Sequence, residues 1–535
     1  MAWNIADLIE HSADAVPDRT ALIVGDREET YAELDARANR LAHHLQASGI
    51  GPGDHVGIYG FNSLEFVETI LAAYKIRAVP INVNYRYVEA ELTYLFDNAD
   101  LVALVHDAQF TPRIAAVRES LPLLQHLIAI DDGSGVDARA IGSVPYDEAL
   151  AAASPARDFP ERSGDDIYIL YTGGTTGMPK GVVWRQEDVI RVLGGGIDFD
   201  TGEVIEDDRT FSRKAAASES DGRGIVIAPL MHGAAQWGTF GSLFNGKTLV
   251  LMPKFDPDEV WKAIGRHRIA GLSITGDAMA RPLVESLEAN NYDASSLVSI
   301  ASTAAVFSAA VKDKFLERLP NLVIAEAVGS TETGYNGATV IVKGTKTKPG
   351  LPTVRMGPDT VVLDENYDVV QPGSGVVGKM ARGGNVPLRY HKDPEKSAAT
   401  FVEVDGKRFA VSGDFAVVEE DGTMTLLGRG SVCINSGGEK IYPEEVEAAL
   451  KAHPDVFDAV VVGVPDERWG ERVAAVVQPR AGRQPTVDAL GEHCRTLVAG
   501  YKVPREVHLV GEIERSPSGK PDYPWAKKVA TAGQV

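Results

Sequence analysis

Short apolar runs alternate with amphipathic segments along most of this chain, and that alternation restricts the folds it can adopt. In residues 31–48, for example, Leu34, Ala38, Leu41 and Leu45 recur at helical spacing, and a strand-like run follows at 55–59. The same succession returns between residues 249 and 327. Strands that alternate with helices predict mostly parallel sheets covered by helices. We therefore expect an α/β fold.

The length of 535 residues exceeds what one compact core holds, which predicts two or more domains. We expect a large N-terminal domain with several subdomains at 1–429. Residues 430–535 are expected to form a small, mobile α+β domain. Its first helix should begin near Pro443, since proline suits the first helical turn and acidic residues follow it.

Charge and cysteine content exclude several classes of protein. A net charge of −22 argues against nucleic-acid binding, which needs a basic surface. Only Cys433 and Cys494 are present, which excludes a disulfide framework and favours a reducing, cytoplasmic location. We expect no export signal, because the first residues lack an apolar core. No apolar run is long enough for a membrane span; peripheral membrane contact and homo-oligomerisation stay open.

Residues 171–181, YTGGTTGMPKG, have the composition of a phosphate-binding loop. Glycines let the backbone approach a ligand closely, while hydroxyls and a lysine suit a polyphosphate. The loop follows an apolar run at 167–170 and precedes a helix-like run at 184–193. It is not a Walker A loop, since that motif places Lys directly after Gly. A flexible surface loop is the alternative. The candidate ligands are Thr172, Gly173, Gly174, Thr175, Thr176, Gly177 and Lys180.

Three further polar motifs follow apolar runs or lie in restricted loops. Residues 327–334, AVGSTETG, offer Glu332 to a metal and Thr331 to a phosphate oxygen. Asp414 follows a strand-like run, where an acid can accept ribose hydroxyls. Lys520 lies in SPSGKP near the C-terminus. Taken singly, these residues could equally belong to a polar turn or an exposed surface.

Residues 196–224 form a polar, charged insert that is poor in large apolar side chains. Such a composition cannot bury enough surface to order itself, so we expect a mobile surface loop. A lid or a partner contact is the functional alternative.

Together, the glycine-rich loop at 171–181 and the three motifs that contain Glu332, Asp414 and Lys520 closely resemble those of the adenylate-forming superfamily. It contains acyl- and aryl-CoA synthetases, peptide-synthetase adenylation domains and firefly-type luciferases. The motifs occur in family order over nearly the whole chain. The WRQEDV and GRGSVCINSGGEK runs further resemble actinobacterial acyl-CoA synthetases, some of which act on steroid side-chain acids.

The resemblance implies a role for each matching residue. Lys520, Glu332, Thr331 and His232 would be catalytic, and Glu332 and Thr176 would hold Mg²⁺. Besides the loop, the nucleotide would contact Val328, Gly329, Ser330, Thr331, Asp414 and Arg429. Val328 stands where the family has an aromatic residue against adenine. The acyl pocket would comprise His232, Trp237, Gly238, Gly276, Ser302, Thr303 and Ala304, whose small members leave volume for a bulky acid. Coenzyme A would pass Gly437, Gly438 and Lys440, with the hinge at Ser431, where the family carries Asp or Lys.

The implied reaction joins a carboxylic acid to coenzyme A at the expense of ATP, through an acyl-AMP intermediate. AMP and pyrophosphate are released. A fatty acid and a steroid acid remain equal alternatives as the substrate. The competing functions are an acyl-AMP ligase that loads a carrier protein, a luciferase-like oxygenase and a non-catalytic binding protein.

Overall fold

The fold was analysed in a computed structural model, which describes residues 3–174, 177–196, 203–345, 351–436, 439–466, 469–516 and 519–532. The chain divides into two compact units. Unit 1 comprises residues 1–273, 292–297 and 385–401, and unit 2 comprises 274–291, 298–384 and 402–535. Each unit is described by itself.

Unit 1 contains a five-stranded parallel sheet in the order β4-β3-β5-β6-β7. Buried apolar side chains form two core clusters, one containing Leu92 and Leu104 and the other Leu41 and Val105. Helix α2 begins after Thr30, whose side chain forms a capping box with Glu33. The elements of this sheet and its helices are α2 (Tyr31–Ala47), β3 (His55–Tyr59), α3 (Leu64–Lys75), β4 (Val79–Asn82), α4 (Glu89–Asn98), β5 (Leu101–Asp107), α5 (Thr111–Arg118), β6 (His126–Ile130), β7 (Val144–Pro145) and α6 (Tyr146–Ala151).

Two further groups of strands complete unit 1. Strands β12, β10, β11 and β1 run parallel in that order, with β2 antiparallel at the edge. Strands β8, β9 and β19 form an antiparallel sheet. The remaining elements are α1 (Ile5–Ala15), β1 (Thr20–Val24), β2 (Arg27–Thr30), β8 (Ile167–Gly174), β9 (Gly177–Arg185), α7 (Gln186–Leu193), α8 (Thr210–Ala217), β10 (Gly224–Val226), α9 (Gly233–Phe244), β11 (Leu249–Leu251), α10 (Pro257–His267), β12 (Gly271–Ile274), β19 (Arg389–Tyr390) and α13 (Pro394–Thr400).

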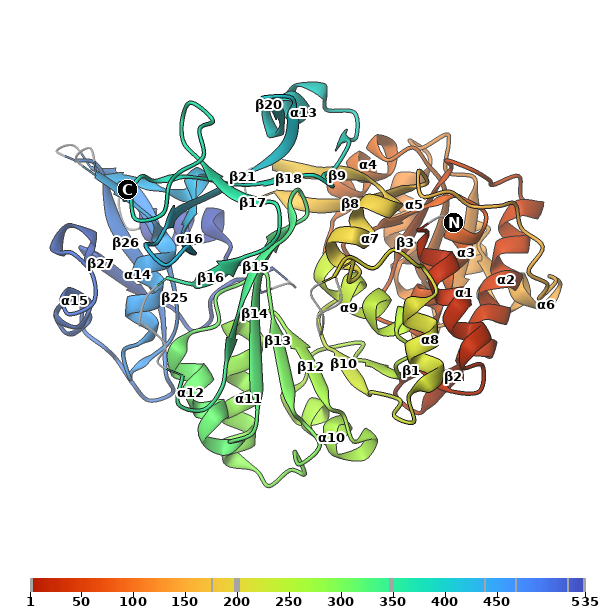
Figure 1. The fold of residues 1–535 in the computed structure, drawn as a ribbon, viewed down its shortest axis with the longest axis horizontal. Coiled ribbons are helices and arrows are strands. Elements are labelled where there is room, and N and C mark those ends of the chain that lie inside the picture. The colour runs from red at the N-terminus through yellow and green to blue at the C-terminus, as the bar shows by residue number, and fades with distance from the viewer. Residues whose placement is uncertain are drawn as a thin grey trace. The chain divides into compact units, whose positions relative to one another are not determined.

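The first part of unit 2 is a sheet that changes from parallel to antiparallel pairing. Strands β13 and β14 are parallel, with α11 and α12 alongside them in Figure 1. From β14 onward the pairs are antiparallel, through β15, β16, β22, β21, β18 and β17. The elements are α11 (Asp277–Ala289), β13 (Ser299–Ser302), α12 (Ala309–Arg318), β14 (Val323–Ser330), β15 (Gly334–Ile341), β16 (Thr353–Met356), β17 (Thr360–Leu363), β18 (Gly378–Gly383), β20 (Phe401–Val404), β21 (Lys407–Val418) and β22 (Thr423–Arg429).

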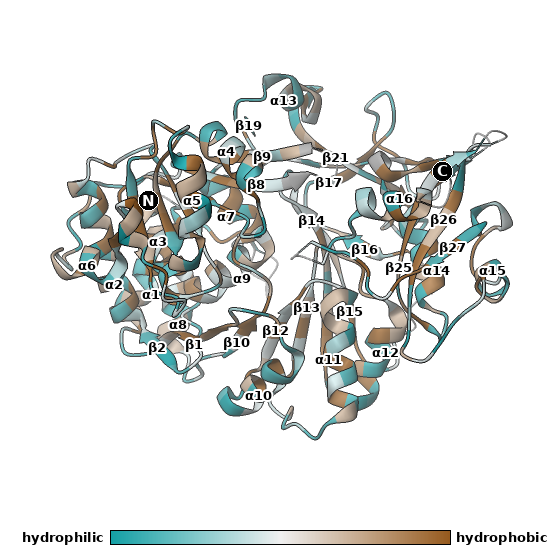
Figure 2. Ribbon diagram, turned by 180° about the vertical axis from the view of Figure 1, so that it is seen from behind, coloured by the Kyte–Doolittle hydropathy of each residue, from teal (hydrophilic) through white to brown (hydrophobic). Residues whose placement is uncertain are grey.

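The last hundred residues build a small sheet of their own within unit 2, in the order β24-β23-β26-β25 with β27 beside β26. Strand β25 is brown over most of its length in Figure 2, as its buried valines require. Two core clusters cover the two faces of this sheet. The elements are β23 (Ile434–Ser436), β24 (Glu439–Ile441), α14 (Pro443–Lys451), β25 (Val456–Asp466), β26 (Gly470–Pro479), α15 (Val487–Arg495), β27 (Glu506–Leu509) and α16 (Tyr523–Thr531).

These observations confirm an α/β fold, whose sheets are mixed rather than uniformly parallel. Helix α14 begins at Pro443 as predicted. The division at residues 429 and 430 stays a prediction. Within the described part of the chain, no helix is long and apolar enough to cross a membrane.

The structure describes residues 196 and 203–224 of the predicted insert, and the expectation of a mobile loop is wrong for Thr210–Ala217 within it. Helix α8 forms there and buries Phe211 and Ala215. The Phe211 ring meets Trp3 edge-on at 6.2 Å, and Arg19 donates hydrogen bonds to the carbonyls of Ala215 and Ser218. A few well-placed apolar residues therefore order a segment whose overall composition is polar. Residues 197–202 of the insert lie outside the described residues.

Candidate active site

The described residues of the predicted phosphate loop lie on the two strands of a β-hairpin, β8 and β9. Strands β8 and β9 pair antiparallel, with Thr172 opposite Lys180 and Gly174 opposite Gly177. Strand β9 continues to Arg185 and α7 begins only at Gln186, so the predicted helix at 184–193 is two residues too long at its start. Thr175 and Thr176 lie outside the described residues, and only the backbone of Gly173, Gly174 and Gly177 is described.

Lys180 lies on β9 of this hairpin, opposite Thr172, and two contacts hold its side chain. Its Nζ lies 2.5 Å from Asp393 Oδ2 and 5.9 Å from the centroid of the Tyr390 ring. Neither partner was predicted from the sequence. Asp393 is 213 positions away in the chain, and a local motif carries no signal for so distant a contact.

In unit 2, Thr331 and Glu332 occupy the turn between β14 and β15. Gly329 precedes this turn, and a Cβ there would lie 2.2 Å from the Gly334 carbonyl oxygen. The glycine is therefore required by the close approach of the two strands. Ser330 contacts Thr333 through its hydroxyl at 2.9 Å, and Val328 packs half-buried against an apolar cluster.

Asp414 and Arg429 form an ion pair across neighbouring strands. They are paired in register on β21 and β22, and Arg429 Nε lies 3.1 Å from Asp414 Oδ1. The Asp414 carboxylate raises the pKa of Arg429. Asp414 was expected at the end of a strand, but β21 continues to Val418, so it lies within the strand.

Glu444, in the first turn of α14, is a site neighbour that the sequence did not reveal. Its Oε1 accepts a hydrogen bond of 3.3 Å from the backbone N–H of Arg429. Burial, followed by the nearby Glu447 carboxylate, raises the pKa of Glu444 to about 8. The position directly follows Pro443 at a helix start, where an exposed acid was the natural expectation.

Lys520 lies on a short hairpin close to these groups. Its backbone N–H donates to Ser516 Oγ at 3.1 Å, and Ser516 N–H donates to the Lys520 carbonyl at 2.9 Å. Burial and the positive charge of Arg429 lower the pKa of Lys520, while Glu332 and Asp414 act in the opposite direction. The fold of unit 2 thus brings four predicted residues, far apart in sequence, within electrostatic reach of one another. Two cations and two carboxylates suit a nucleotide with a bound cation.

The predicted acyl-pocket residues of unit 1 lie on or beside α9. His232 is the residue before the first turn of this helix. The buried Trp237 meets Tyr168 at 5.5 Å and Phe240 at 5.3 Å, both edge-on. A Cβ on Gly238 would meet only Val226, at 3.6 Å, so this glycine does leave space.

The acyl-pocket residues of unit 2 surround the start of α11. Ser302 Oγ accepts a hydrogen bond of 3.1 Å from Gly276 N–H. The expectation that Gly276 leaves volume for the substrate is wrong, because it has φ +59° and a Cβ would lie 2.6 Å from the Val306 carbonyl oxygen. A glycine is needed at this position because the backbone conformation and the close carbonyl oxygen leave no room for a Cβ. Thr303 donates its N–H to the Ile274 carbonyl at 3.3 Å, and Ala304 is exposed with φ +69°.

The residues predicted for the hinge and for coenzyme A are only partly described. Ser431 lies in a 3₁₀ turn, residues Gly430–Val432, directly after β22, and its side chain is not described. Gly437 and Gly438 lie outside the described residues. Lys440 is on β24, with Nζ 5.8 Å from the Phe415 ring centroid.

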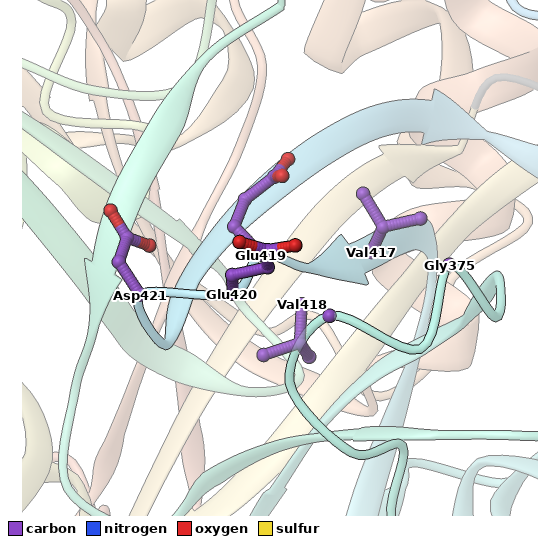
Figure 3. A pocket seen from close by; sticks show the side chains of 7 residues that line it. Gly375, Val417, Val418, Glu419, Glu420 and Asp421 are labelled. Atoms are coloured by element: carbon purple, nitrogen blue, oxygen red, sulfur yellow. The ribbon is translucent and has the colours of Figure 1, made fainter.

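A surface pocket of about 470 Å³ lies elsewhere in unit 2 (Figure 3). Its lining includes Gly373, Gly375, Val417, Val418, Glu419, Glu420 and Asp421. The carboxylates make this lining acidic, which does not suit an anionic nucleotide or acid, and none of the predicted site residues that the structure describes is among the lining residues named above.

Comparison with known proteins identifies the family. Residues 9–390 match the family described as AMP-binding enzyme, and residues 445–520 match the AMP-binding enzyme C-terminal domain. The chain is 55% identical to a 3-oxocholest-4-en-26-oate–CoA ligase of Rhodococcus rhodochrous, covering 98% of this chain and 96% of that protein. It is 54% identical to a medium/long-chain-fatty-acid–CoA/3-oxocholest-4-en-26-oate–CoA ligase of Mycobacterium tuberculosis (strain ATCC 25618 / H37Rv), covering 99% and 97%.

The fold agrees with that assignment. The crystal structure of the anthranilate CoA ligase AuaEII in complex with anthranoyl-AMP superposes with a TM-score of 0.84 at 23% identity, covering 99% of this chain and 98% of that one. This likeness supports the architecture of a large N-terminal and a small C-terminal domain. The chain belongs to the AMP-binding enzyme family.

Proposed function

We propose that this chain is an ATP-dependent acid–thiol ligase that converts a carboxylic acid to its coenzyme A thioester through an acyl-AMP. The observation that carries the proposal is the grouping of Lys520, Arg429, Glu332 and Asp414 in unit 2. The relatives named above are CoA ligases, which favours coenzyme A over a carrier protein as the acyl acceptor.

In the first half-reaction, a carboxylate oxygen forms a bond to the α-phosphorus of ATP, and the bond to pyrophosphate breaks. Both reactants are anionic, so the site must offset their repulsion. Lys520 would donate to the oxygens shared by the carboxylate and the α-phosphate. Arg429 would contact the phosphate, and Asp414 would accept the ribose hydroxyls.

Mg²⁺ fits this site as a cation held mainly by the nucleotide. Among the described residues, no group of three or more His, Cys, Asp or Glu side chains could hold a metal. Nucleotide-bound Mg²⁺ needs only one or two protein carboxylates besides the phosphates, and Glu332 supplies one, with Thr331 beside it as a phosphate ligand. When bound, Mg²⁺ would neutralise charge on the triphosphate and the leaving pyrophosphate.

In the second half-reaction, the coenzyme A thiol forms a bond to the acyl carbon, and AMP leaves with one of the carboxylate oxygens. We propose that residues 430–535 rotate about the Ser431 region between the halves. Lys520 would serve the first half, and the segment of Gly437, Gly438 and Lys440 would line the thiol passage in the second. His232 lies at the start of the helix that carries Trp237 and would lie beside the acyl group.

For the substrate, we propose a steroid side-chain carboxylate, with medium- to long-chain fatty acids as a second class. The printed names of the two relatives support this choice. A Cβ on Gly238 of α9 would meet only Val226, at 3.6 Å, and the room left beside this glycine suits a bulky acid. Cytoplasmic location remains a prediction, and peripheral membrane contact and homo-oligomerisation are possibilities that the sequence left open.

Pyrophosphate release tests the proposal. The purified chain is supplied with ATP, Mg²⁺ and either 3-oxocholest-4-en-26-oate or a fatty-acid series, with and without coenzyme A. We expect pyrophosphate, AMP and the steroid thioester in equal amounts when coenzyme A is present. Acyl transfer to a carrier protein but not to coenzyme A would overturn the proposed acceptor. No acid-dependent pyrophosphate with any acid would overturn the ligase assignment.

A further inference from the structure

The lysine of the phosphate hairpin has a dedicated partner in a distant segment of unit 1. Lys180 Nζ donates to Asp393 Oδ2 at 2.5 Å, and the Tyr390 ring lies beside the same ammonium at 5.9 Å. We propose that Asp393 is a positioning residue, which holds the Lys180 side chain of β9 in place before ATP binds. This inference rests on the proposed function, because it assumes that Lys180 binds ATP phosphates.

Asp393 can position a lysine because it is itself fixed. Its Oδ1 accepts a hydrogen bond of 2.9 Å from the Lys396 N–H, which makes it the N-cap of α13. One carboxylate oxygen therefore caps a helix while the other holds Lys180. Helix α13 thus anchors the carboxylate and leaves it little freedom to turn away.

The segment that carries Asp393 is joined to the strand that carries Lys180. Strand β19 pairs antiparallel with β9, with Arg389 opposite Val183. The pairing extends beyond β19, because His391 N–H donates to the Gly181 carbonyl at 2.7 Å. Only Lys392 then separates this ladder from Asp393. The two strands therefore set the spacing between the lysine and the carboxylate.

Lys392, the residue between the β19 ladder and Asp393, has an unusual backbone conformation. It has φ +52°, in the left-handed region that non-glycine residues rarely adopt. Its ammonium is held by Asp100 at 2.7 Å. A conformation of this kind persists only where the surroundings determine it. The sheet on one side and the N-cap on the other supply that determination.

Stability alone is a weak explanation for the Lys180–Asp393 pair. The side chains are 41% and 29% exposed, and ion pairs at such positions contribute little to folding. A carboxylate beside a nucleotide site also repels ATP, in a chain whose net charge is already −22. This electrostatic cost needs a compensating benefit.

Pre-organisation supplies that benefit. A free lysine side chain is flexible and must lose rotamer freedom when it binds a phosphate. Lys180 has already lost that freedom on Asp393. An ammonium has three N–H donors, so the bond to Asp393 leaves two for phosphate oxygens. Hydrogen bonds from Lys180 and then from the Lys396 N–H lower the pKa of Asp393, so the partner carries its charge at neutral pH.

A double-mutant cycle separates positioning from a structural role. The variants are Asp393→Asn, Lys180→Met and the double variant, and the readout is kcat/KM for ATP in the adenylation half-reaction. Asparagine caps helices as well as aspartate does, so α13 is retained. We expect Asp393→Asn to lower kcat/KM for ATP about tenfold alone, and less than about twofold when Lys180→Met is present. The KM for the acid should stay unchanged in Asp393→Asn.

Asp100→Asn is the matched control, since it removes the ion pair of Lys392 in the same segment and leaves the Lys180–Asp393 pair intact. It should keep kcat/KM for ATP within about twofold of the parent chain. Equal losses from Asp393→Asn in both backgrounds, or no loss in either, would overturn the positioning role. Wild-type kinetics in Lys180→Met would overturn the assumed phosphate role of Lys180. Acid-dependent pyrophosphate release by the parent chain tests the proposed function independently of all four variants.

Discussion

Replacing Lys520 with alanine should separate the two half-reactions. The structure leaves this lysine partly buried, within electrostatic reach of Arg429, Glu332 and Asp414. Burial means that water screens its charge poorly, so the charge acts strongly on any anion that enters. Adenylation is the step in which negative charge is shared between carboxylate and α-phosphate. Lys520→Ala should therefore impair adenylation and spare thioester formation from supplied acyl-AMP.

The size of the effect follows from the charge that is lost. At an effective dielectric constant of about 20, two unit charges about 4 Å apart interact by about 4 kcal/mol. That energy corresponds to about three orders of magnitude in rate. Loss of one donor to a developing anion in other enzymes costs about 10²- to 10³-fold. We therefore expect adenylation to fall by about 10²- to 10³-fold, mainly in kcat.

The assay measures each half by itself. Pyrophosphate release from ATP and acid reports the first half, and thioester formation from synthetic acyl-AMP and coenzyme A reports the second. Lys527→Ala, on the exposed face of α16, is the control and should leave both halves unchanged. The reasoning is refuted if Lys520→Ala adenylates at the parent rate, or if both halves fall alike in a folded protein.

Three further predictions concern the same part of unit 2. Because burial lowers the pKa of Lys520, kcat/KM for adenylation should decline as the pH rises through a value below the pKa of a free lysine. Lys520→Arg should move this decline to higher pH. If the decline stays where it is, Lys520 is not its source. Gly519 has φ +75°, and a Cβ on it would lie 2.9 Å from Ala278 Cβ. Gly519→Ala should therefore slow adenylation more than thioester formation. Gly511→Ala is the control and should slow neither half-reaction, because no atom lies within 4 Å of a Cβ at that position. The folded pKa of about 8 for Glu444 exceeds its usual 4.5, so between these values the folded state holds a proton that the unfolded state has released. The free energy of unfolding should therefore fall as the pH rises from 4.5 to 8. In denaturant titrations, Glu444→Gln should remove up to about 4 kcal/mol of this fall, and an unchanged pH dependence in the variant would contradict the prediction.

The sequence predicted those elements whose pattern is local. The stripe of Leu34, Ala38, Leu41 and Leu45 predicted a helix at 31–48, and α2 spans Tyr31–Ala47. The prediction of a mobile insert failed because it relied on overall composition and gave no weight to Phe211 and Ala215, which α8 buries. Averaged polarity says little about a short helix that needs only two or three buried side chains.

The candidate site shows the same limit. Lys180, Glu332, Asp414 and Lys520 stood out through their motifs, and their roles came from resemblance rather than from the residues alone. Asp393 was missed because its partner is set by the pairing of β19 with β9, a contact between distant segments. Gly276 was misread because a glycine required by φ and one that leaves space for a ligand look identical in a sequence.

The central claim is that the acid passes through an acyl-AMP, and oxygen labelling tests it most directly. The carboxylate oxygens of 3-oxocholest-4-en-26-oate are labelled with ¹⁸O, and the products of one complete reaction with ATP and coenzyme A are analysed by mass spectrometry. The account predicts one ¹⁸O in each AMP and none in pyrophosphate, because the attacking oxygen leaves with AMP. Label in orthophosphate together with ADP, or unlabelled AMP beside the thioester, would contradict it.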